Sequence, residues 1–258
     1  STVTISGGAT MNSAVAAGSY LAGNFTSTIG NTVLNITGGT FNTNGYKSDV
    51  LNVGGTNGAS GDITASVTAG TFNGEILSTI NEGFITGGTF TVDPSEFVDD
   101  DYKVVENNGV YTLELRSVVA KVGDAEYRTL AKAVAAVEDG GTITLVADVT
   151  FDELTRTHNS GNWYDGLYYI GDKGFTIDLN DKTISHDGSV NDYLLNFKND
   201  GSKANTINIK NGTLDAGTTA YCALCTASSH DNQLTINLEN VHLINNKDNG
   251  STMKVRAG

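Results

Sequence analysis

The chain has 258 residues, of which 38% are hydrophobic and 17% are charged, and its formal net charge is −14. The negative charge argues against nucleic acid as a partner, and the absence of an apolar run of about 18 residues argues against membrane insertion. The 31 glycines, the single proline and the many threonines and asparagines favour strands and tight turns, so an all-helical fold is excluded.

The first predicted elements are strands of an internal repeat, I-T-G-G-T-F. It occurs at 36–41 and 85–90, with variants at 5–11 and 67–72. In each copy the Ile and the Phe can point inward on two short strands, while Gly-Gly forms the corner by adopting positive φ. A constant unit separated by insertions of variable length is typical of a solenoid.

Residues 92–117 follow the repeats and predict a hairpin cap, because Asn107-Asn-Gly109 is a hairpin signal. Such a hairpin would cover the last coil of a first module, residues 1–117. The same segment carries Glu96 and the run 99–101, three aspartates that could bind Ca²⁺ through their oxygens. The alternative is a solvated acidic face, and no other cofactor is expected.

A second module, residues 118–258, begins with a predicted hairpin at 120–127 and a helix at about 129–138. Apolar residues at helical spacing indicate the helix, Thr129 can cap its N-terminus, and Gly140-Gly141 can end it. We expect this short helix to plug the open N-terminal end of a new solenoid. We also expect the module to be truncated at its C-terminus, as part of a longer multidomain chain.

The coils of the second module are predicted from strands that recur about every 30 residues. The pattern aligns Ile143, Ile177, Ile207 and Ile236, and apolar and polar residues alternate along each strand. The Asn-Asp, Asn-Gly and Glu-Asn pairs that follow are turn residues that tolerate left-handed backbone. The predicted fold class is therefore all-β, a parallel β-helix of two consecutive modules with a short capping helix between them.

The segment 152–169 interrupts the second series and contains the only Trp. Aromatic faces beside polar side chains suit sugar binding, because ring C–H groups stack on them while hydroxyls find polar partners. The alternative is packing over the coil edge. The candidate ligand-binding residues are Trp163, Tyr164, Asp165 and Tyr168.

The two cysteines form one C-x-x-C motif, Cys222 and Cys225. A zinc site would need a second ligand pair, which the sequence does not supply nearby. A redox site would favour a helix after this motif, whereas the segment reads as a strand. We therefore expect packing or a structural disulfide.

The G-G-T-F units at 38–41 and 87–90, the A-G-T-F unit at 69–72 and the segment 119–145 resemble the pectin-lyase-like right-handed parallel β-helix modules of large surface proteins of gut bacteria. The resemblance implies a right-handed β-helix in an extracellular, adhesin-like protein on the bacterial surface or secreted from the cell. It implies a stalk or adhesion role, with glycans or a host surface as partners.

Some proteins of this fold are polysaccharide lyases or glycoside hydrolases, and that activity is the alternative function. A lyase needs a basic side chain near the abstracted proton, and a hydrolase needs converging carboxylates. The available arginines are Arg116, Arg128, Arg156 and Arg256. The densest aspartates are Asp178, Asp181 and Asp187, but the next coil mostly has asparagine at the equivalent positions. No catalytic residue is assigned, and we favour a non-catalytic module.

Two further sets of residues have ordinary explanations. The four histidines show no ligand spacing and are expected to be polar outward positions: His158, His186, His230 and His242. Three asparagines match the glycosylation sequon, which chance explains in a chain so rich in Asn and Thr: Asn24, Asn35 and Asn211.

Overall fold

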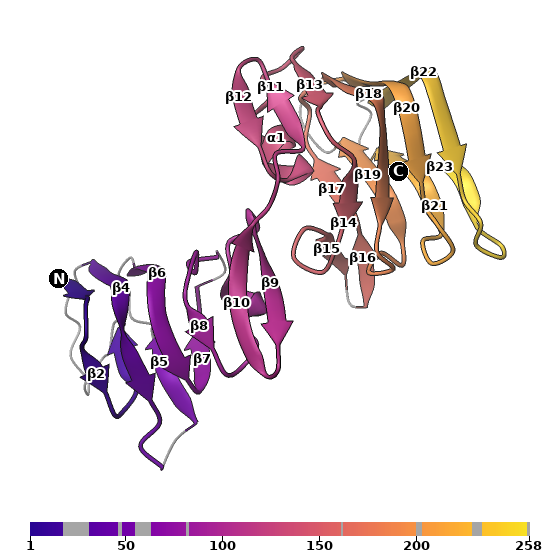
Figure 1. Ribbon diagram of the computed structural model, residues 1–258. Helices are drawn as coiled ribbons and strands as arrows, with labels where there is room; N and C mark the ends of the chain where they lie inside the picture. The colour runs from indigo at the N-terminus through magenta and orange to yellow at the C-terminus, as the bar shows by residue number, and fades with distance from the viewer. Residues whose placement is uncertain are drawn as a thin grey trace, which may run out of the picture. The chain divides into compact units, whose positions relative to one another are not determined.

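The computed structural model describes residues 1–17, 31–45, 48–54, 63–80, 83–160, 162–199, 203–228 and 234–256 (Figure 1). The protein is nearly all β, with 59% of residues in strands, and its parallel sheets stack as a β-solenoid of about seven turns. The predicted fold class is therefore confirmed. The chain divides into two compact units, Ser1–Arg116 and Ser117–Gly258.

The first unit contains two sheets whose strand orders are β1-β4-β6-β8-β10-β9, with β2 beside β4, and β3-β5-β7. Its elements are β1 (Thr2–Ile5), β2 (Thr10–Met11), β3 (Val15–Ala17), β4 (Thr32–Asn42), β5 (Asp49–Val53), β6 (Ile63–Asn73), β7 (Glu75–Ser78), β8 (Thr89–Phe90), the 3₁₀ turn η1 (Ser95–Phe97), β9 (Tyr102–Asn107) and β10 (Val110–Leu115). The strands of successive coils pair in parallel, whereas the β9–β10 hairpin joins β8 in antiparallel orientation. The hairpin turn has positive φ at Asn108 and Gly109, as the sequence predicts.

The glycine corners of β4 and β6 lie inside single long strands, not between two short ones as expected, whereas Gly7-Gly8 lies between the short strands β1 and β2, as expected. Within β6, Gly70 has a φ of +134°, and a Cβ at that position would lie 3.0 Å from the ring of Phe72. Glycine therefore lets the ring lie against the bent backbone. The inward rings stack from coil to coil, with centroid distances of 4.6 Å for Phe41–Phe72 and 5.0 Å for Phe72–Phe90.

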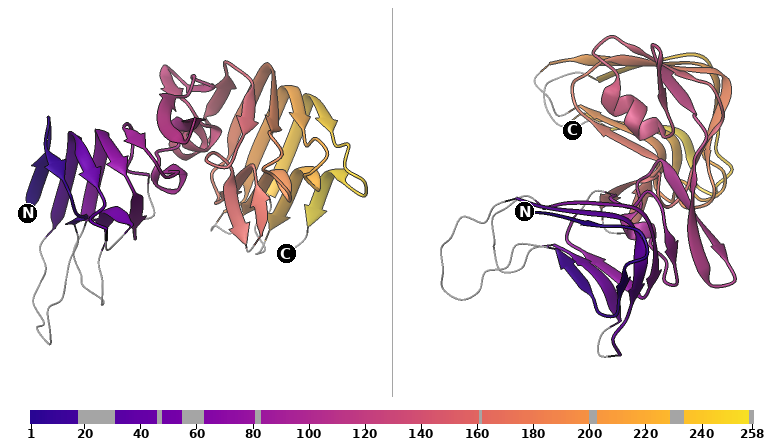
Figure 2. Two further views of the ribbon diagram at one scale, coloured as in Figure 1. Left: turned by 60° about the horizontal axis from the view of Figure 1, so that its bottom comes forward. Right: turned by 60° about the vertical axis from the view of Figure 1, so that its left-hand side comes forward.

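The second unit contains sheets ordered β12-β11-β13-β18-β20-β22, with β14 beside β18, and β17-β19-β21-β23, together with the β15–β16 pair. Its elements are β11 (Ala120–Val122), β12 (Ala125–Tyr127), α1 (Leu130–Ala136), β13 (Thr142–Leu145), β14 (Val149–Phe151), β15 (Thr157–Ser160), β16 (Trp163–Asp165), β17 (Leu167–Ile170), β18 (Phe175–His186), β19 (Tyr193–Asn199), β20 (Asn205–Asp215), β21 (Cys222–Ser228), β22 (Leu234–Ile244) and β23 (Ser251–Arg256). Figure 2 shows the stacked coils of this unit from two further directions. The β11–β12 hairpin is the one expected at 120–127.

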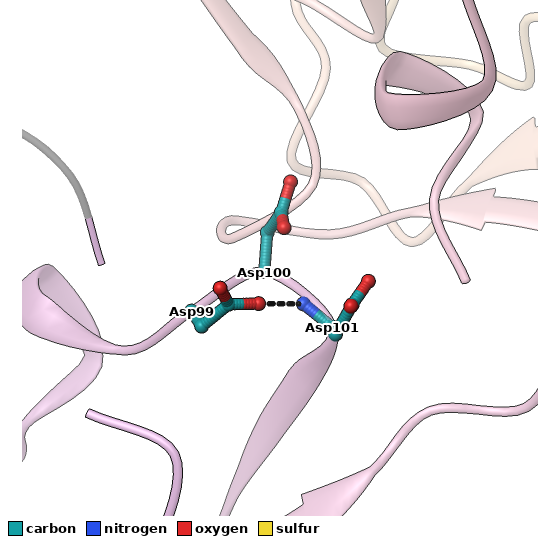
Figure 3. Close-up of side chains that lie close together, drawn as sticks. All are labelled: Asp99, Asp100 and Asp101. Atoms are coloured by element: carbon teal, nitrogen blue, oxygen red, sulfur yellow. Dashed lines mark hydrogen bonds between the residues drawn. The ribbon is translucent and has the colours of Figure 1, made fainter. Parts of the chain in front are cut away.

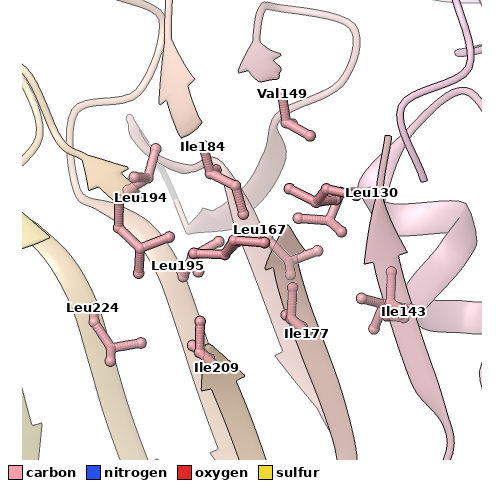
Figure 4. Packing of buried hydrophobic residues seen from close by; sticks show 14 of the residues in the cluster. Leu130, Ile143, Val149, Leu167, Ile177, Ile184, Leu194, Leu195, Ile209 and Leu224 are labelled. Atoms are coloured by element: carbon pink, nitrogen blue, oxygen red, sulfur yellow. The ribbon is translucent and has the colours of Figure 1, made fainter. Parts of the chain in front are cut away.

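The helix α1 covers the first coil of the second unit, as the sequence predicts. The Thr129 side chain accepts a hydrogen bond from the Lys132 amide and caps the N-terminus. Leu130 and Val134 are buried in the same core as Ile143 and Ile177, and Figure 4 shows side chains of this core converging from several strands. The helix therefore supplies apolar contacts that a preceding coil would otherwise supply.

The register of the second unit corrects the predicted alignment by two residues at one step. Ile143 lies opposite Ile177, and Ile207 opposite Ile236, but Ile177 lies opposite Ile209. A shift of two residues keeps the same side chains facing inward, so the alternation alone does not reveal it. The extra residues are accommodated at the corner of β18, where Asn180 and the next residue both have positive φ.

Candidate functional site

The 152–169 segment forms a short antiparallel hairpin, β15–β16, on the second unit. Its register shifts between His158 and Ser160, and Trp163 lies at the start of β16. The Trp163 side chain is 46% exposed, which is unusual for so large an apolar group in a well-packed unit. The hairpin therefore presents an indole ring at the surface.

Contacts on both sides of Tyr164 hold this hairpin in place. The Tyr164 amide donates to Asn191 Oδ1 at 2.7 Å, and Asn191 Nδ2 donates to the Asn162 carbonyl at 2.8 Å. The Arg156 guanidinium lies 3.9 Å from the Tyr164 ring centre and donates to the Ser189 carbonyl at 2.7 Å. The Tyr164 ring therefore packs against the Arg156 guanidinium, and that face of the ring is not open to a ligand.

Asp165 is fully buried, and its carboxylate is used inside the protein. One oxygen accepts the Tyr193 amide at 3.1 Å and the other accepts Asn196 Nδ2 at 2.9 Å. These bonds tie β16 to β19 on the next coil. Since a buried carboxylate is stable only when its oxygens are satisfied, Asp165 anchors the hairpin.

The structure brings Trp163 together with a residue that sequence reasoning missed, Tyr221. The two ring centroids lie 5.8 Å apart with the planes tilted by 52°, and Tyr221 is 41% exposed. Lys247 Nζ lies 4.5 Å from the centre of the Tyr221 ring and donates to the Thr219 carbonyl at 2.8 Å. We call Trp163, Tyr221 and Lys247 the aromatic platform.

Among the four residues predicted to bind a ligand, Trp163 alone is exposed. Tyr164 and Tyr168 are half-buried, and Tyr168 lies on β17 opposite Asn196. No pattern in the sequence links Tyr221 with Trp163, because Tyr221 lies directly before β21 whereas Trp163 lies on the separate strand β16.

The acidic run at 99–101 does form a cluster. Its three carboxylates lie within 4.8 Å of one another, and they are the one such group of three among the described residues (Figure 3). The Asp99 carboxylate accepts the Asp101 amide at 2.8 Å, and Glu96 is exposed and outside the group. The donor type suits Ca²⁺, but the same geometry is common in acidic turns, so the cluster alone assigns no metal.

The carboxylates considered for hydrolysis are engaged in local structure. Asp178 accepts hydrogen bonds from the Asn180 amide and from Asn211 Nδ2, both at 3.1 Å, and pairs with Lys210 at 3.3 Å. Burial alone would raise the pKa of Asp178, but these partners outweigh it and lower the pKa. A general acid needs the opposite shift.

The other two aspartates lie in turns. Asp181 has a φ of +59° and is exposed, and Asp187 accepts the amide of Ser189 at 2.9 Å. Both geometries are ordinary for turn-forming Asp. Neither residue belongs to a described group of three ligand-forming side chains.

The arginines and histidines also have structural partners where their side chains are described. Arg116 Nε donates to the Tyr102 carbonyl at 3.0 Å, and Arg128 directly precedes the N-cap of α1. His186 Nδ1 accepts the Gly188 amide at 3.0 Å, so Nε2 carries the proton and donates to the Ala216 carbonyl at 2.8 Å. This ring is half-buried rather than simply outward-facing.

His242 is exposed on β22, Asn35 lies half-buried in β4, and Asn211 is bonded to the Asp178 carboxylate. His230 and Asn24 lie outside the described residues, as do the side chains of His158 and Arg256.

The cysteines lie on β21 as buried, reduced thiols. Cys222 Sγ contacts the Leu224 carbonyl at 3.1 Å, and burial raises the pKa of the Cys222 thiol. Packing, one of the two expected roles, is what the structure shows. A high thiol pKa is unfavourable for redox or nucleophilic chemistry.

Comparisons with protein-family models, with curated proteins and with solved structures returned no match. In the described part of the chain, no helix has the length and hydropathy needed to cross a membrane. The class that the structure defines is a parallel β-solenoid carrying a surface aromatic pair.

Proposed function

We propose that the chain is a non-catalytic module of an extracellular bacterial surface protein, a stalk or adhesin that contacts glycans through the aromatic platform. The observation that carries the proposal is the exposed pair Trp163 and Tyr221, contributed by different coils. Sugar C–H faces pack on such rings, while a neighbouring cation and backbone groups can meet the hydroxyls. The resemblance of the repeats to pectin-lyase-like surface modules supports the location.

Hydrogen bonds within the protein hold two parts of the platform. Asn191 and Arg156 hold the hairpin that presents Trp163, and Thr219 fixes Lys247 beside Tyr221. A surface ordered in advance loses less conformational entropy on binding. Large aromatic side chains at the centre of a contact commonly carry much of the binding energy.

The non-catalytic part of the proposal is supported by the use made of the acidic side chains. Asp165 anchors a strand, Asp178 braces a coil corner, and Asp187 forms a turn. A retaining or inverting hydrolase needs two carboxyl groups facing a sugar bond across a cleft. The roles of these aspartates inside the fold are sufficient to explain them.

The test is an array of plant polysaccharides, host glycans and mucins probed with the full chain, Trp163→Ala and Tyr221→Ala. Ile170→Ala is the matched control, because Ile170 is 44% exposed in the same unit. We expect each aromatic variant to weaken binding by about tenfold or more and the control to bind normally. Absence of glycan binding, or binding unaffected by both aromatic variants, would overturn the glycan role, and release of reducing or unsaturated ends would overturn the non-catalytic role.

A further inference from the structure

A polar groove with a volume of about 580 Å³ lies on the outer face of the second unit's main sheet. Thr176, Thr206 and Asn208 alternate with buried residues along β18 and β20, so their side chains face outward. Phe175 and Asn205, which also line the groove, are buried. The groove shares no residue with the aromatic platform. It is lined by Asp139, Gly140, Gly174, Phe175, Thr176 and Lys203, and by Ala204, Asn205, Thr206, Asn208 and Thr235.

One end of the groove is an ion pair that the backbone holds in position. Lys203 Nζ lies 2.6 Å from Asp139 Oδ2, while the other carboxylate oxygen of Asp139 accepts the Gly174 amide at 2.8 Å. The Gly140 amide in turn donates to the Gly174 carbonyl at 2.7 Å. A carboxylate and an ammonium group, both about half exposed, therefore lie side by side at the groove.

The floor is a ladder of amides and hydroxyls on successive coils. Asn208 Nδ2 contacts Thr176 Oγ1 at 3.4 Å, and Asn208 Oδ1 accepts Asn237 Nδ2 at 2.9 Å. Thr206 and Thr235 lie opposite each other on β20 and β22. Gly174 lies close against the backbone of β20, since a Cβ there would lie 2.7 Å from the Thr206 carbonyl oxygen, and no side chain fits at this position.

We propose that this groove binds a neutral saccharide, through hydroxyl contacts with the Asp139–Lys203 pair and with Asn208. Each sugar hydroxyl donates and accepts, which matches a carboxylate beside an ammonium and an amide that offers both functions. The paired charges cancel, so the site has no excess charge to attract an ion. The volume is within the usual range for a small-molecule site.

The protonation of the pair predicts how binding depends on pH. The hydrogen bond from Lys203 lowers the pKa of Asp139, and the hydrogen bond to Asp139 raises the pKa of Lys203. Both groups therefore remain charged across the neutral range, and we expect saccharide binding to be independent of pH there.

The experiment is a two-dimensional NMR titration of the full chain with two neutral disaccharides, lactose and cellobiose. The readouts are the side-chain amide of Asn208 and the backbone amide of Gly174. Thr206→Trp fills the groove from an exposed position, and Lys203→Met removes its donor. Lys210→Met is the control, because Lys210 lies on β20, the strand that follows Lys203, but pairs with Asp178 outside the groove.

We expect saturable shifts of both amides in the natural chain, in Lys210→Met and in Trp163→Ala, and no shifts in Thr206→Trp or Lys203→Met. Absence of shifts with both sugars, or shifts that persist in Thr206→Trp, would overturn the groove proposal. Trp163→Ala separates this site from the platform. Loss of array binding with the groove shifts intact would concern the platform alone.

Discussion

Phe41 and Phe72 lie opposite each other on neighbouring parallel strands, and their rings stack 4.6 Å apart with planes within 3° of parallel. That distance is close to the spacing of adjacent strands, about 4.8 Å. Each inward-facing ring therefore packs on the ring of the equivalent residue in the next coil. Stability in such a fold depends on contacts between neighbouring coils.

Phe72→Ala should remove the middle ring of this stack. Phe72 is fully buried and contacts Phe41 on one side and Phe90 on the other, so we expect a loss of about 3–5 kcal/mol in the stability of the first unit. Hydrogen exchange of the β6 amides measures it, with the neighbouring Thr71→Ala as control. A loss below about 1 kcal/mol would show that the stack contributes little.

Lys173→Met should loosen the end of α1. Lys173 Nζ donates to the carbonyls of Val134, Ala135 and Val137, at 3.2, 3.1 and 2.7 Å, and so satisfies the C-terminus of the helix. We expect local stability to fall by about 1–2 kcal/mol, measured by exchange of the helix amides. Lys182→Met is the control, and equal exchange rates in both variants would refute the capping role.

The Asp139 carboxyl should titrate below its ordinary pKa of 3.8, because Lys203 and the Gly174 amide stabilise its charged form. Its contribution to stability is present above the unfolded-state pKa and is lost as pH falls through the lower folded-state pKa. Carboxyl NMR titration checks the shift. In Lys203→Met the pKa should rise toward 3.8, and an unchanged value would contradict the assigned cause.

Cys222 should react slowly with thiol reagents in the folded protein. Its thiol is buried, and burial raises its pKa, so little thiolate forms at neutral pH. Mass spectrometry after iodoacetamide treatment should find Cys222 unmodified until denaturant is added. Rapid native labelling at neutral pH would reopen a reactive role for the motif.

Much of the fold could be predicted because the repeat places the same residue types at the same coil positions. Ile36 and Phe41 are buried, the corner glycine has positive φ, and Thr129 caps the helix, as their types require. The position of Ile177 opposite Ile209 could not be predicted. Inserting two residues leaves the inward pattern intact, so hydrophobic alternation does not report it.

The candidate site was less predictable, because it depends on which residues of distant coils meet. Composition singled out Trp163 as the only tryptophan, but it did not single out Tyr221. The contact between the two rings depends on the path of the 152–169 segment. Asp165 was predicted to bind a sugar, but its carboxylate accepts hydrogen bonds from Tyr193 and Asn196 and joins two strands. Nothing in the sequence links Asp139 with Lys203, which are 64 residues apart but form an ion pair in the fold.

The most direct test of the glycan role uses the fluorescence of the single tryptophan, Trp163, during titration of the full chain with the best ligand from the array. We expect a saturable change in emission, reduced quenching by acrylamide in the complex, and weaker binding in Tyr221→Ala. A glycan that binds the chain while the emission and quenching of Trp163 stay constant would contradict this expectation.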